Sequence, residues 1–156
     1  MSLHAKLLER QHNPLRVGLI GAGKFGAMYI AQVQKTTGVH LVGIADVSPA
    51  NAKENLRRTG WPVHAYGAAS LDAALKERRT HLSDDWEALV RHPGIDIIIE
   101  STGNPPAAIE HALAAFRNRK HVVMVTVEAD AFCGFLLAQK AAEAGVVYSL
   151  AYGDQP

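Results

Sequence analysis

The sequence predicts an α/β fold in which a doubly wound parallel sheet is covered by helices on both faces. The first observation is alternation, because short apolar segments take turns with segments whose apolar residues recur every three or four positions. The second is a glycine-rich run at 21–26, which directly follows the first apolar segment. Strands that alternate with helices pair in parallel, since each helix carries the chain back across a face of the sheet.

About six strands are expected, five of them as short apolar runs bounded by a turn or by the start of a helix, and one, 80–83, as a short and more polar segment between two helices. In chain order they are 16–20, 41–45, 80–83, 95–100, 121–125 and 146–150. The run 95–100 is apolar at nearly every position, which is typical of a strand buried on both faces. Doubly wound sheets of this kind consist of two similar halves, so we expect the strand order 3-2-1-4-5-6.

Helices are expected where apolar residues recur at helical spacing between a capping residue and a glycine or proline. In chain order they are 3–11, 25–37, 49–59, 71–79, 86–91, 105–116 and 129–144. Residues that favour a helix N-cap precede several of them, at Ser48, Ser70 and either Asp84 or Asp85. The segment 61–69 fits neither the strand pattern nor the helix pattern.

The glycine-rich run has the spacing G-x-G-x-x-G between a strand and a helix. It consists of Gly21, Ala22, Gly23, Lys24, Phe25 and Gly26. In this setting Gly21 permits a sharp turn, Gly23 lets the backbone approach a pyrophosphate, and Gly26 lets the helix pack closely on the sheet. Backbone N–H groups and the helix dipole favour an anion at this point. We therefore expect this run to bind a dinucleotide; the alternative is a set of turn glycines in another strand–helix–strand unit.

Asp46 ends the second strand about 20 residues after Gly26, the distance at which a carboxylate reaches the adenosine ribose hydroxyls. A carboxylate accepts hydrogen bonds from a free 2′-hydroxyl and repels a 2′-phosphate, so Asp46 narrowly favours NAD over NADP. NADP stays open, because three cations on the following helix could hold a phosphate unless they are simply solvated. These cations are Lys53, Arg57 and Arg58.

Ligands of doubly wound sheets bind beyond the carboxyl ends of the strands, where the strand order reverses. This rule adds the residues after the fourth strand to the expected cofactor contacts: Ser101, Thr102, Gly103 and Asn104. Glu128 and Asp154, which follow the fifth and sixth strands, are candidates for the substrate side. The alternative is that Glu128 flanks the next helix and that Asp154 forms a turn with Gly153.

The composition argues against several other functions. The chain has 156 residues, a formal net charge of +1 and 48% hydrophobic residues, which is typical of one globular domain. A net charge this small does not indicate binding to nucleic acid or to an anionic membrane. No apolar stretch is long enough to span a bilayer. The eight histidines show no metal-ligand spacing, and one cysteine forms no internal disulfide. We therefore expect a cytoplasmic location, without a metal, nucleic-acid or membrane partner.

Motifs at the strand ends make the chain resemble the N-terminal part of homoserine dehydrogenase-like NAD(P)-dependent oxidoreductases. The motifs are R-V-G-L-I-G-A-G at 16–23, I-A-D at 44–46, I-E-S-T-G at 99–103 and K-H-V-V-M at 120–124. Two further segments, 127–130 and 147–156, are similar to a branch that has a SAF-type domain and resembles 1-deoxy-D-xylulose 5-phosphate reductoisomerase. The resemblance implies a Rossmann fold and hydride transfer between a nicotinamide cofactor and a small polar carbonyl or hydroxy compound. For the branch, the implied cofactor is NADPH.

The chain also departs from this family in two ways. Homoserine dehydrogenases carry an Asn-Lys pair after the fifth strand, where this chain has Thr126 and Val127. A valine supplies neither a positive charge nor a proton, so homoserine is doubtful as a substrate. Family members also continue into a domain that holds the substrate-binding groups. We therefore expect residues 1–156 to be one dinucleotide-binding domain, with 1–13 as a helical lead-in, that belongs to a longer protein and is inactive alone.

Two classes of function stay open from the sequence. In the first, the parent protein is an oxidoreductase that acts on a small-molecule substrate. In the second, the chain is a non-catalytic module that binds or senses NAD(P), since a fold alone does not fix a function. Apolar surface exposed by the missing domain would also favour a homo-oligomer.

Overall fold

The computed structural model describes residues 2–151. The strands are β1 (Leu15–Ile20), β2 (Val39–Ala45), β3 (Tyr66–Ala68), β4 (Thr80–Ser83), β5 (Ile97–Glu100), β6 (His121–Met124) and β7 (Tyr148–Leu150). The helices are α1 (Leu3–Glu9), α2 (Lys24–Val33), α3 (Pro49–Arg58), α4 (Leu71–Glu77), α5 (Trp86–Arg91), α6 (Pro105–Arg117) and α7 (Val127–Ala144). A short 3-10 helix, η1 (Val63–Ala65), precedes β3.

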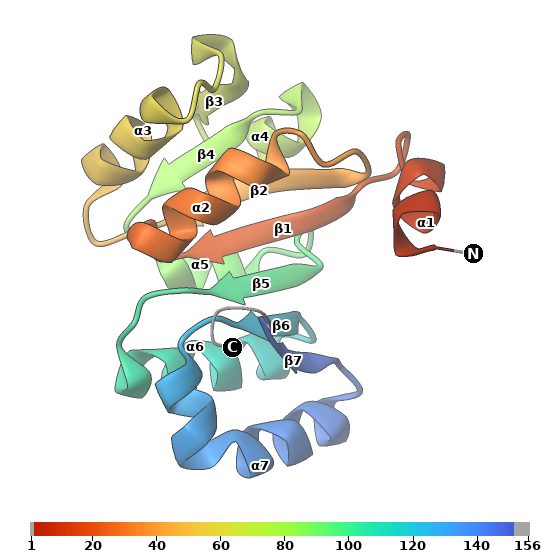
Figure 1. Cartoon of the computed structure of the whole chain (residues 1–156), viewed down its shortest axis with the longest axis vertical. Helices are drawn as coiled ribbons and strands as arrows, with labels where there is room; N and C mark the ends of the chain where they lie inside the picture. Colours follow the sequence, from red (N-terminus) through yellow and green to blue (C-terminus); the bar gives the residue numbers. More distant parts are fainter. Residues whose placement is uncertain (1, 152–156) are drawn as a thin grey trace.

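The strands form one parallel sheet in the order β3-β4-β2-β1-β5-β6-β7 (Figure 1). The predicted α/β class with a parallel sheet is therefore confirmed. The direction of the strand order changes between β1 and β5, because β2 lies on one side of β1 and β5 on the other. This arrangement brings the carboxyl ends of β1, β2 and β5 to the same edge of the sheet, where ligands of such sheets bind.

The predicted sheet of about six strands in the order 3-2-1-4-5-6 is wrong, because the sheet has seven strands. The additional strand is β3, which pairs with β4 at the edge of the sheet. It lies in the segment that fitted neither sequence pattern. Its register with β4 shifts at Gly67, whose φ is +78°, so β3 is too short and irregular to show the alternation of a strand. The six predicted strands keep their expected neighbours in the sheet.

Helices cover both faces of the sheet, and a separate hydrophobic core lies between the sheet and the helices on each face. Leu19 of β1 packs with Ile30 of α2 and Leu56 of α3 on one face. The next residue, Ile20, belongs to the core on the other face, which also contains Phe116 of α6. Figure 1 shows α2 across the near face of β1 and β2, with α5 behind the sheet. Within residues 2–151, no helix is both long enough and apolar enough to cross a membrane.

An ion pair joins β1 to the chain before β5 at the amino ends of the strands, opposite their carboxyl ends. Asp96 Oδ2 accepts hydrogen bonds from the Arg16 backbone N–H at 3.0 Å and from its Nε at 2.9 Å, while Oδ1 accepts from Nη2 at 2.5 Å. Partial burial raises the pKa of Asp96, but the hydrogen bonds from Arg16 outweigh it and hold that pKa below its usual value. Asp96 is therefore more acidic in the folded chain than in the unfolded chain.

We expect the free energy of unfolding to decrease less on acidification in Asp96→Asn than in the wild-type chain. Because the pKa of Asp96 is lower in the folded chain, its ionised carboxylate stabilises the fold at pH values above the unfolded-state pKa of about 3.9. This stabilisation disappears as the pH falls through the folded-state pKa. Because the Arg16 side chain is 40% exposed, solvent screens the pair and the effect is about 1 kcal/mol or less. The measurement is the free energy of unfolding in urea between pH 6 and pH 3.

Glu9→Gln is the matched control, because Glu9 is an exposed acid at the end of α1. Its pH profile should follow that of the wild-type chain. A profile of the Asp96→Asn variant that runs parallel to the wild type would contradict the assignment.

Candidate functional site

The glycine-rich run forms the turn between β1 and α2. Gly21 has a φ of +90°, and a Cβ at this position would lie 2.8 Å from the Ser101 backbone. A Cβ on Gly26 would overlap the carbonyl oxygen of Gly21. By contrast, nothing lies within 4 Å of a Cβ added to Gly23. Gly21 and Gly26 are thus required for the turn and for close packing, while Gly23 borders open space that a ligand can occupy.

The N-terminus of α2 has free hydrogen-bond donors. Its N-cap is Gly23, which has no side chain to accept from the first-turn N–H groups. The N–H groups of Lys24, Phe25 and Gly26 have no partner inside the helix, as in any first helical turn. The helix dipole adds a positive potential at the same point. An anion is therefore favoured at the N-terminus of α2.

Asp46, which follows β2, is hydrogen-bonded to the glycine turn. Its Oδ2 accepts from the Ala22 N–H at 2.6 Å, and its Oδ1 accepts from the Ser48 N–H at 2.8 Å. Ser48 occupies the N-cap position of α3 as expected, but its side chain makes no capping hydrogen bond. The carboxylate of Asp46 thus joins the loop after β2 to the turn after β1.

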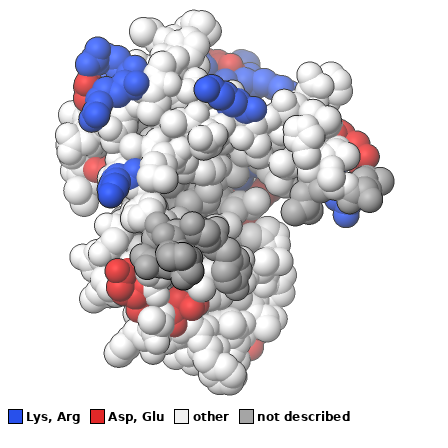
Figure 2. All heavy atoms as spheres, viewed as in Figure 1, with Lys and Arg blue, Asp and Glu red and all other residues white. Residues whose placement is uncertain are grey.

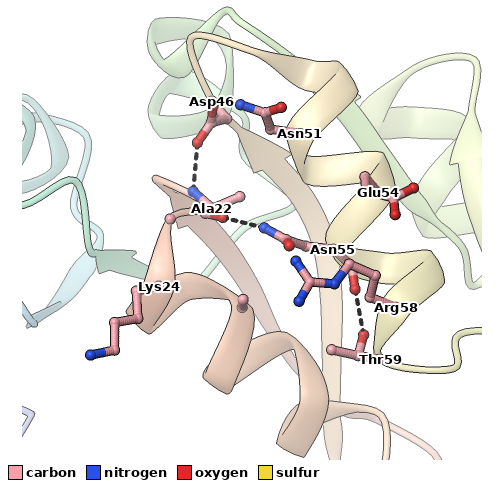
Figure 3. Close-up of a pocket in the computed structure, with 10 residues that line it drawn as sticks. Ala22, Lys24, Asp46, Asn51, Glu54, Asn55, Arg58 and Thr59 are labelled. Atoms are coloured by element: carbon pink, nitrogen blue, oxygen red, sulfur yellow. Dashed lines mark hydrogen bonds between the residues drawn. The ribbon is translucent and has the colours of Figure 1, made fainter.

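The carbonyl group of Ala22 is held as well. Asn55 in α3 donates a hydrogen bond from Nδ2 to the Ala22 carbonyl oxygen at 2.6 Å (Figure 3). Asp46 and Asn55 therefore bind both polar groups of the Ala22 backbone. This pair of contacts fixes the middle of the turn before any ligand is bound.

Two hollows meet at this turn, and both are lined by Gly23 and Asp46. The α2–α3 groove has a volume of about 690 Å³ and is also lined by Lys24, Asn51, Glu54, Asn55 and Arg58. The switch-point crevice has a volume of about 470 Å³ and is also lined by Gly21, Trp86, Ser101, Thr102, Asn104 and His111. Both volumes are typical of small-molecule sites. Because the crevice lies where the strand order changes direction, it is the expected place for a ligand.

A buried polar cluster borders the crevice and is centred on Glu100, the last residue of β5. The Glu100 residue is 0% exposed. Its Oε1 accepts from the Thr102 hydroxyl at 2.6 Å and lies 3.2 Å from His111 Nδ1, while its Oε2 accepts from the Thr126 hydroxyl at 2.5 Å. The Trp86 ring packs against the His111 ring, with centroids 4.5 Å apart. The cluster joins the ends of β5 and β6 to α5 and α6.

The residues predicted after the fourth strand lie along the crevice. Ser101 is largely buried, and its hydroxyl donates to the Gly21 carbonyl oxygen at 2.7 Å. Thr102 and Asn104 line the crevice, and Asn104 Oδ1 also caps α6 by accepting from a backbone N–H at 3.3 Å. Gly103 donates its N–H to a side chain of the polar cluster. Direct contact between these residues and a cofactor stays a prediction.

The remaining predicted residues are distributed around the site. Lys24 lines the groove, but its side chain points away from Asp46 (Figure 3). Phe25 is exposed, and Glu128 is exposed on the first turn of α7; neither lines the groove or the crevice. Asp154 lies outside the described residues. The roles predicted for these four residues stay predictions.

The three cations predicted on α3 do not form one cluster. Arg58 lines the α2–α3 groove, whereas Arg57 forms an ion pair with Glu54 at 2.6 Å. Lys53 lines neither the groove nor the crevice. Figure 2 shows Lys and Arg side chains gathered over the α3 end of the molecule and Asp and Glu side chains near α6 and α7. In the described part of the chain, no group of three or more His, Cys, Asp or Glu is placed to hold a metal ion.

The site also contains three residues that are not among those predicted from the sequence: Asn55, Glu100 and His111. The sequence does contain a signal for Glu100, because an acidic residue at the end of an otherwise apolar strand is either at a site or buried with partners. Asn55 and His111 have no comparable signal, since each acquires its role only when a helix packs against a distant turn or strand. Asn55 and its partner Ala22 are 33 positions apart.

Comparisons with known proteins agree with this geometry. A family model described as "Oxidoreductase family, NAD-binding Rossmann fold" matches residues 15–152. A curated homoserine dehydrogenase from Methylobacillus glycogenes is 32% identical over 114 residues, which cover 70% of this chain and 24% of that protein. The chain thus spans about a quarter of the length of this relative.

Two solved structures illustrate the structural likeness. A homoserine dehydrogenase from Thiobacillus denitrificans matches with a TM-score of 0.68 at 22% identity, over 88% of this chain and 29% of that one. A biliverdin reductase from Synechocystis sp. PCC 6803, in complex with biliverdin and NADP+, matches with a TM-score of 0.64 at 26% identity, over 88% of this chain and 38% of that one.

We expect Asn55→Ala to loosen the glycine turn. The substitution removes the hydrogen bond to the partly buried Ala22 carbonyl, which should lower the free energy of unfolding by about 0.5–1.5 kcal/mol. It should also speed the hydrogen exchange of backbone amides around Gly23. Denaturation in urea and hydrogen exchange measure the two effects.

Asn51→Ala is the control for this variant, because Asn51 lies on the same helix and lines the same groove. Its stability should stay within about 0.5 kcal/mol of the wild type. Equal effects of the two substitutions would show that Asn55 does not hold the turn.

Proposed function

The chain belongs to the oxidoreductase family with an NAD-binding Rossmann fold, and from this premise we propose that residues 1–156 form the dinucleotide-binding domain of a nicotinamide-dependent oxidoreductase. The observation that carries the proposal is the position of Asp46 beside the uncapped N-terminus of α2. A carboxylate for ribose hydroxyls and free N–H groups for a pyrophosphate are the two groups that a dinucleotide needs. The family assignment gives no support to a purely sensory module.

The reaction that we propose is hydride transfer between the nicotinamide and a small polar carbonyl or hydroxy compound. The likeness to a homoserine dehydrogenase supports this class of substrate. Thr126 and Val127 stand where the family resemblance implies an Asn-Lys pair, and Val127 cannot carry a charge or a proton. We therefore favour a substrate other than homoserine, and the reductoisomerase-like branch stays a prediction. Glu128 and Asp154 stay candidates for the substrate side.

For the cofactor we propose NAD in preference to NADP. A 2′-phosphate on the adenosine ribose would lie beside the carboxylate of Asp46, which lines the groove. Two negative charges in contact repel each other. Of the three cations predicted to hold a 2′-phosphate, Arg58 also lines the groove. Its positive charge keeps NADP as the second candidate.

The chain alone should bind the cofactor without turning over substrate. Positioning a substrate against the nicotinamide supplies a large part of the catalysis in such enzymes. The α2–α3 groove and the switch-point crevice both lie beside the glycine turn and Asp46, which suits a dinucleotide that extends from one hollow to the other. Self-association stays a prediction, for which the exposed side chains of Phe132 and Phe135 on α7 provide apolar surface.

We expect NADH to bind the wild-type chain at least about tenfold more tightly than NADPH, a difference of about 1.4 kcal/mol. Asp46→Ala should weaken NADH binding by about tenfold or more, because hydrogen bonds to a charged group contribute about 1.5–3 kcal/mol. The same substitution should reduce the preference for NADH over NADPH. Isothermal titration calorimetry with both nucleotides measures these constants.

Asp72→Ala is the control, since Asp72 is an exposed acid on α4. This variant should bind NADH like the wild type. Tighter binding of NADPH than of NADH would reverse the proposed preference. If neither nucleotide binds at millimolar concentration, the proposed function fails.

A further inference from the structure

In the loop between β5 and α6, the backbone N–H groups of residues 102–104 donate hydrogen bonds within the protein. Thr102 donates its N–H to Glu100 Oε1 at 3.3 Å, and Gly103 donates its N–H to Thr126 Oγ1 at 3.1 Å. Asn104 donates its N–H to Thr102 Oγ1 at 3.2 Å. The three consecutive N–H groups of residues 102–104 are therefore all bound inside the protein.

The buried carboxylate of Glu100 sets the direction of these hydrogen bonds. A carboxylate only accepts, so the hydroxyls of Thr102 and Thr126 must donate their single protons to it. Each hydroxyl oxygen is then left with lone pairs only, and these accept the N–H groups of Asn104 and Gly103. Glu100 therefore determines, through two threonines, that the loop turns its N–H groups inward.

The N-terminus of α6 is closed to anions for the same kind of reason. Its first two residues are Pro105 and Pro106, which have no N–H group. The next N–H group, of Ala107, is bound by the side chain of Asn104, and that of Ala108 is bound by the Asn104 backbone. The dipole of α6 thus has no free donor at its start, in contrast to α2.

What the loop can still offer a ligand is acceptors. Within residues 2–151, no hydrogen bond is directed to the carbonyl oxygens of Thr102 and Gly103. The side chain of Asn104 uses Oδ1 for the helix cap, so its remaining group is the amide NH2. Thr102 and Asn104 both line the switch-point crevice. Unpaired carbonyl oxygens in a loop beside the crevice suit a group that carries O–H or N–H donors and no negative charge, and they disfavour a carboxylate or phosphate.

We propose that Glu100 is a positioning residue that makes the loop 102–104 an acceptor site for the carboxamide and ribose hydroxyls of the nicotinamide half of the cofactor. This inference rests on the proposed function, because it needs a nicotinamide dinucleotide in the crevice. The phosphates bind at α2, where donors are free. The nicotinamide riboside, which carries no negative charge, then extends to the loop after β5, where only acceptors and one amide are available.

The first test compares two dinucleotides on the wild-type chain by calorimetry. NAD+ and nicotinic acid adenine dinucleotide differ only in that the second has a carboxylate in place of the carboxamide. A carboxylate cannot donate to carbonyl oxygens and is repelled by them, so the second dinucleotide should bind at least about tenfold more weakly. ADP, which lacks the nicotinamide riboside, serves as the probe for the adenosine and pyrophosphate contacts.

The second test changes the direction of the hydrogen bonds. Thr126→Val keeps the side-chain shape but removes the hydroxyl that links Gly103 to Glu100. We expect it to weaken NAD+ by about tenfold, to reduce the discrimination against the carboxylate analogue, and to leave the affinity for ADP within about twofold. Thr126→Ser keeps the hydroxyl and should restore both properties. A purely structural threonine would lower the melting temperature without changing the ratio of NAD+ to ADP affinity.

The outcomes separate the two claims. If the wild-type chain binds ADP and NAD+ but does not discriminate against the carboxylate analogue, the inference is wrong and the proposed function stands. Equal losses of ADP and NAD+ affinity in Thr126→Val would also overturn the inference. If the wild-type chain binds neither ADP nor NAD+, the proposed function fails and the inference fails with it.

Discussion

The contact between Asp46 and the Ala22 N–H is the interaction on which the geometry of the site depends. This hydrogen bond, with 2.6 Å between the Ala22 nitrogen and Asp46 Oδ2, connects the carboxyl ends of β1 and β2. Together with the contact from Asn55, it holds the glycine turn in place. An ionised carboxylate has about four acceptor positions, and the contacts with Ala22 and Ser48 use two of them. Asp46 can therefore accept ribose hydroxyls without releasing the turn. Such preorganisation lowers the entropic cost of binding a ligand.

The two ends of the sheet have different tasks. At the amino ends, Arg16 and Asp96 join β1 to the chain before β5, and the buried Lys120 donates to the carbonyl oxygens of His92 and Ile95. These hydrogen bonds lie within the protein and connect the strands to the loop before β5. At the carboxyl ends the glycine turn leaves N–H groups free. The contacts that hold the strands together thus lie at the amino ends of the strands, and the candidate site lies at their carboxyl ends. This separation allows the site to keep unpaired donors.

The sequence predicts well those features that depend only on residues close together along the chain. The glycine spacing, the apolar run before it and the caps at Ser70 and Asp85 depend on local backbone geometry, and all are present. The edge strand β3 has only three residues, so periodicity could not reveal it. Asn55 looks like any polar residue on an exposed helix face until α3 packs beside the glycine turn. Its role depends on a contact across 33 positions, and local patterns contain no information on such contacts.

The two strand–turn–helix units at the centre of the sheet have the same topology but opposite polarity toward a ligand. After β1, Gly23 leaves the first-turn N–H groups of α2 without a cap. After β5, Asn104, Pro105 and Pro106 satisfy or remove the corresponding donors of α6. A ligand with an anionic middle and an end that carries no negative charge can lie across these units in only one favourable direction, with its phosphates at α2. The fold therefore supplies two equivalent positions, and a few side chains at the helix starts decide which of them favours an anion.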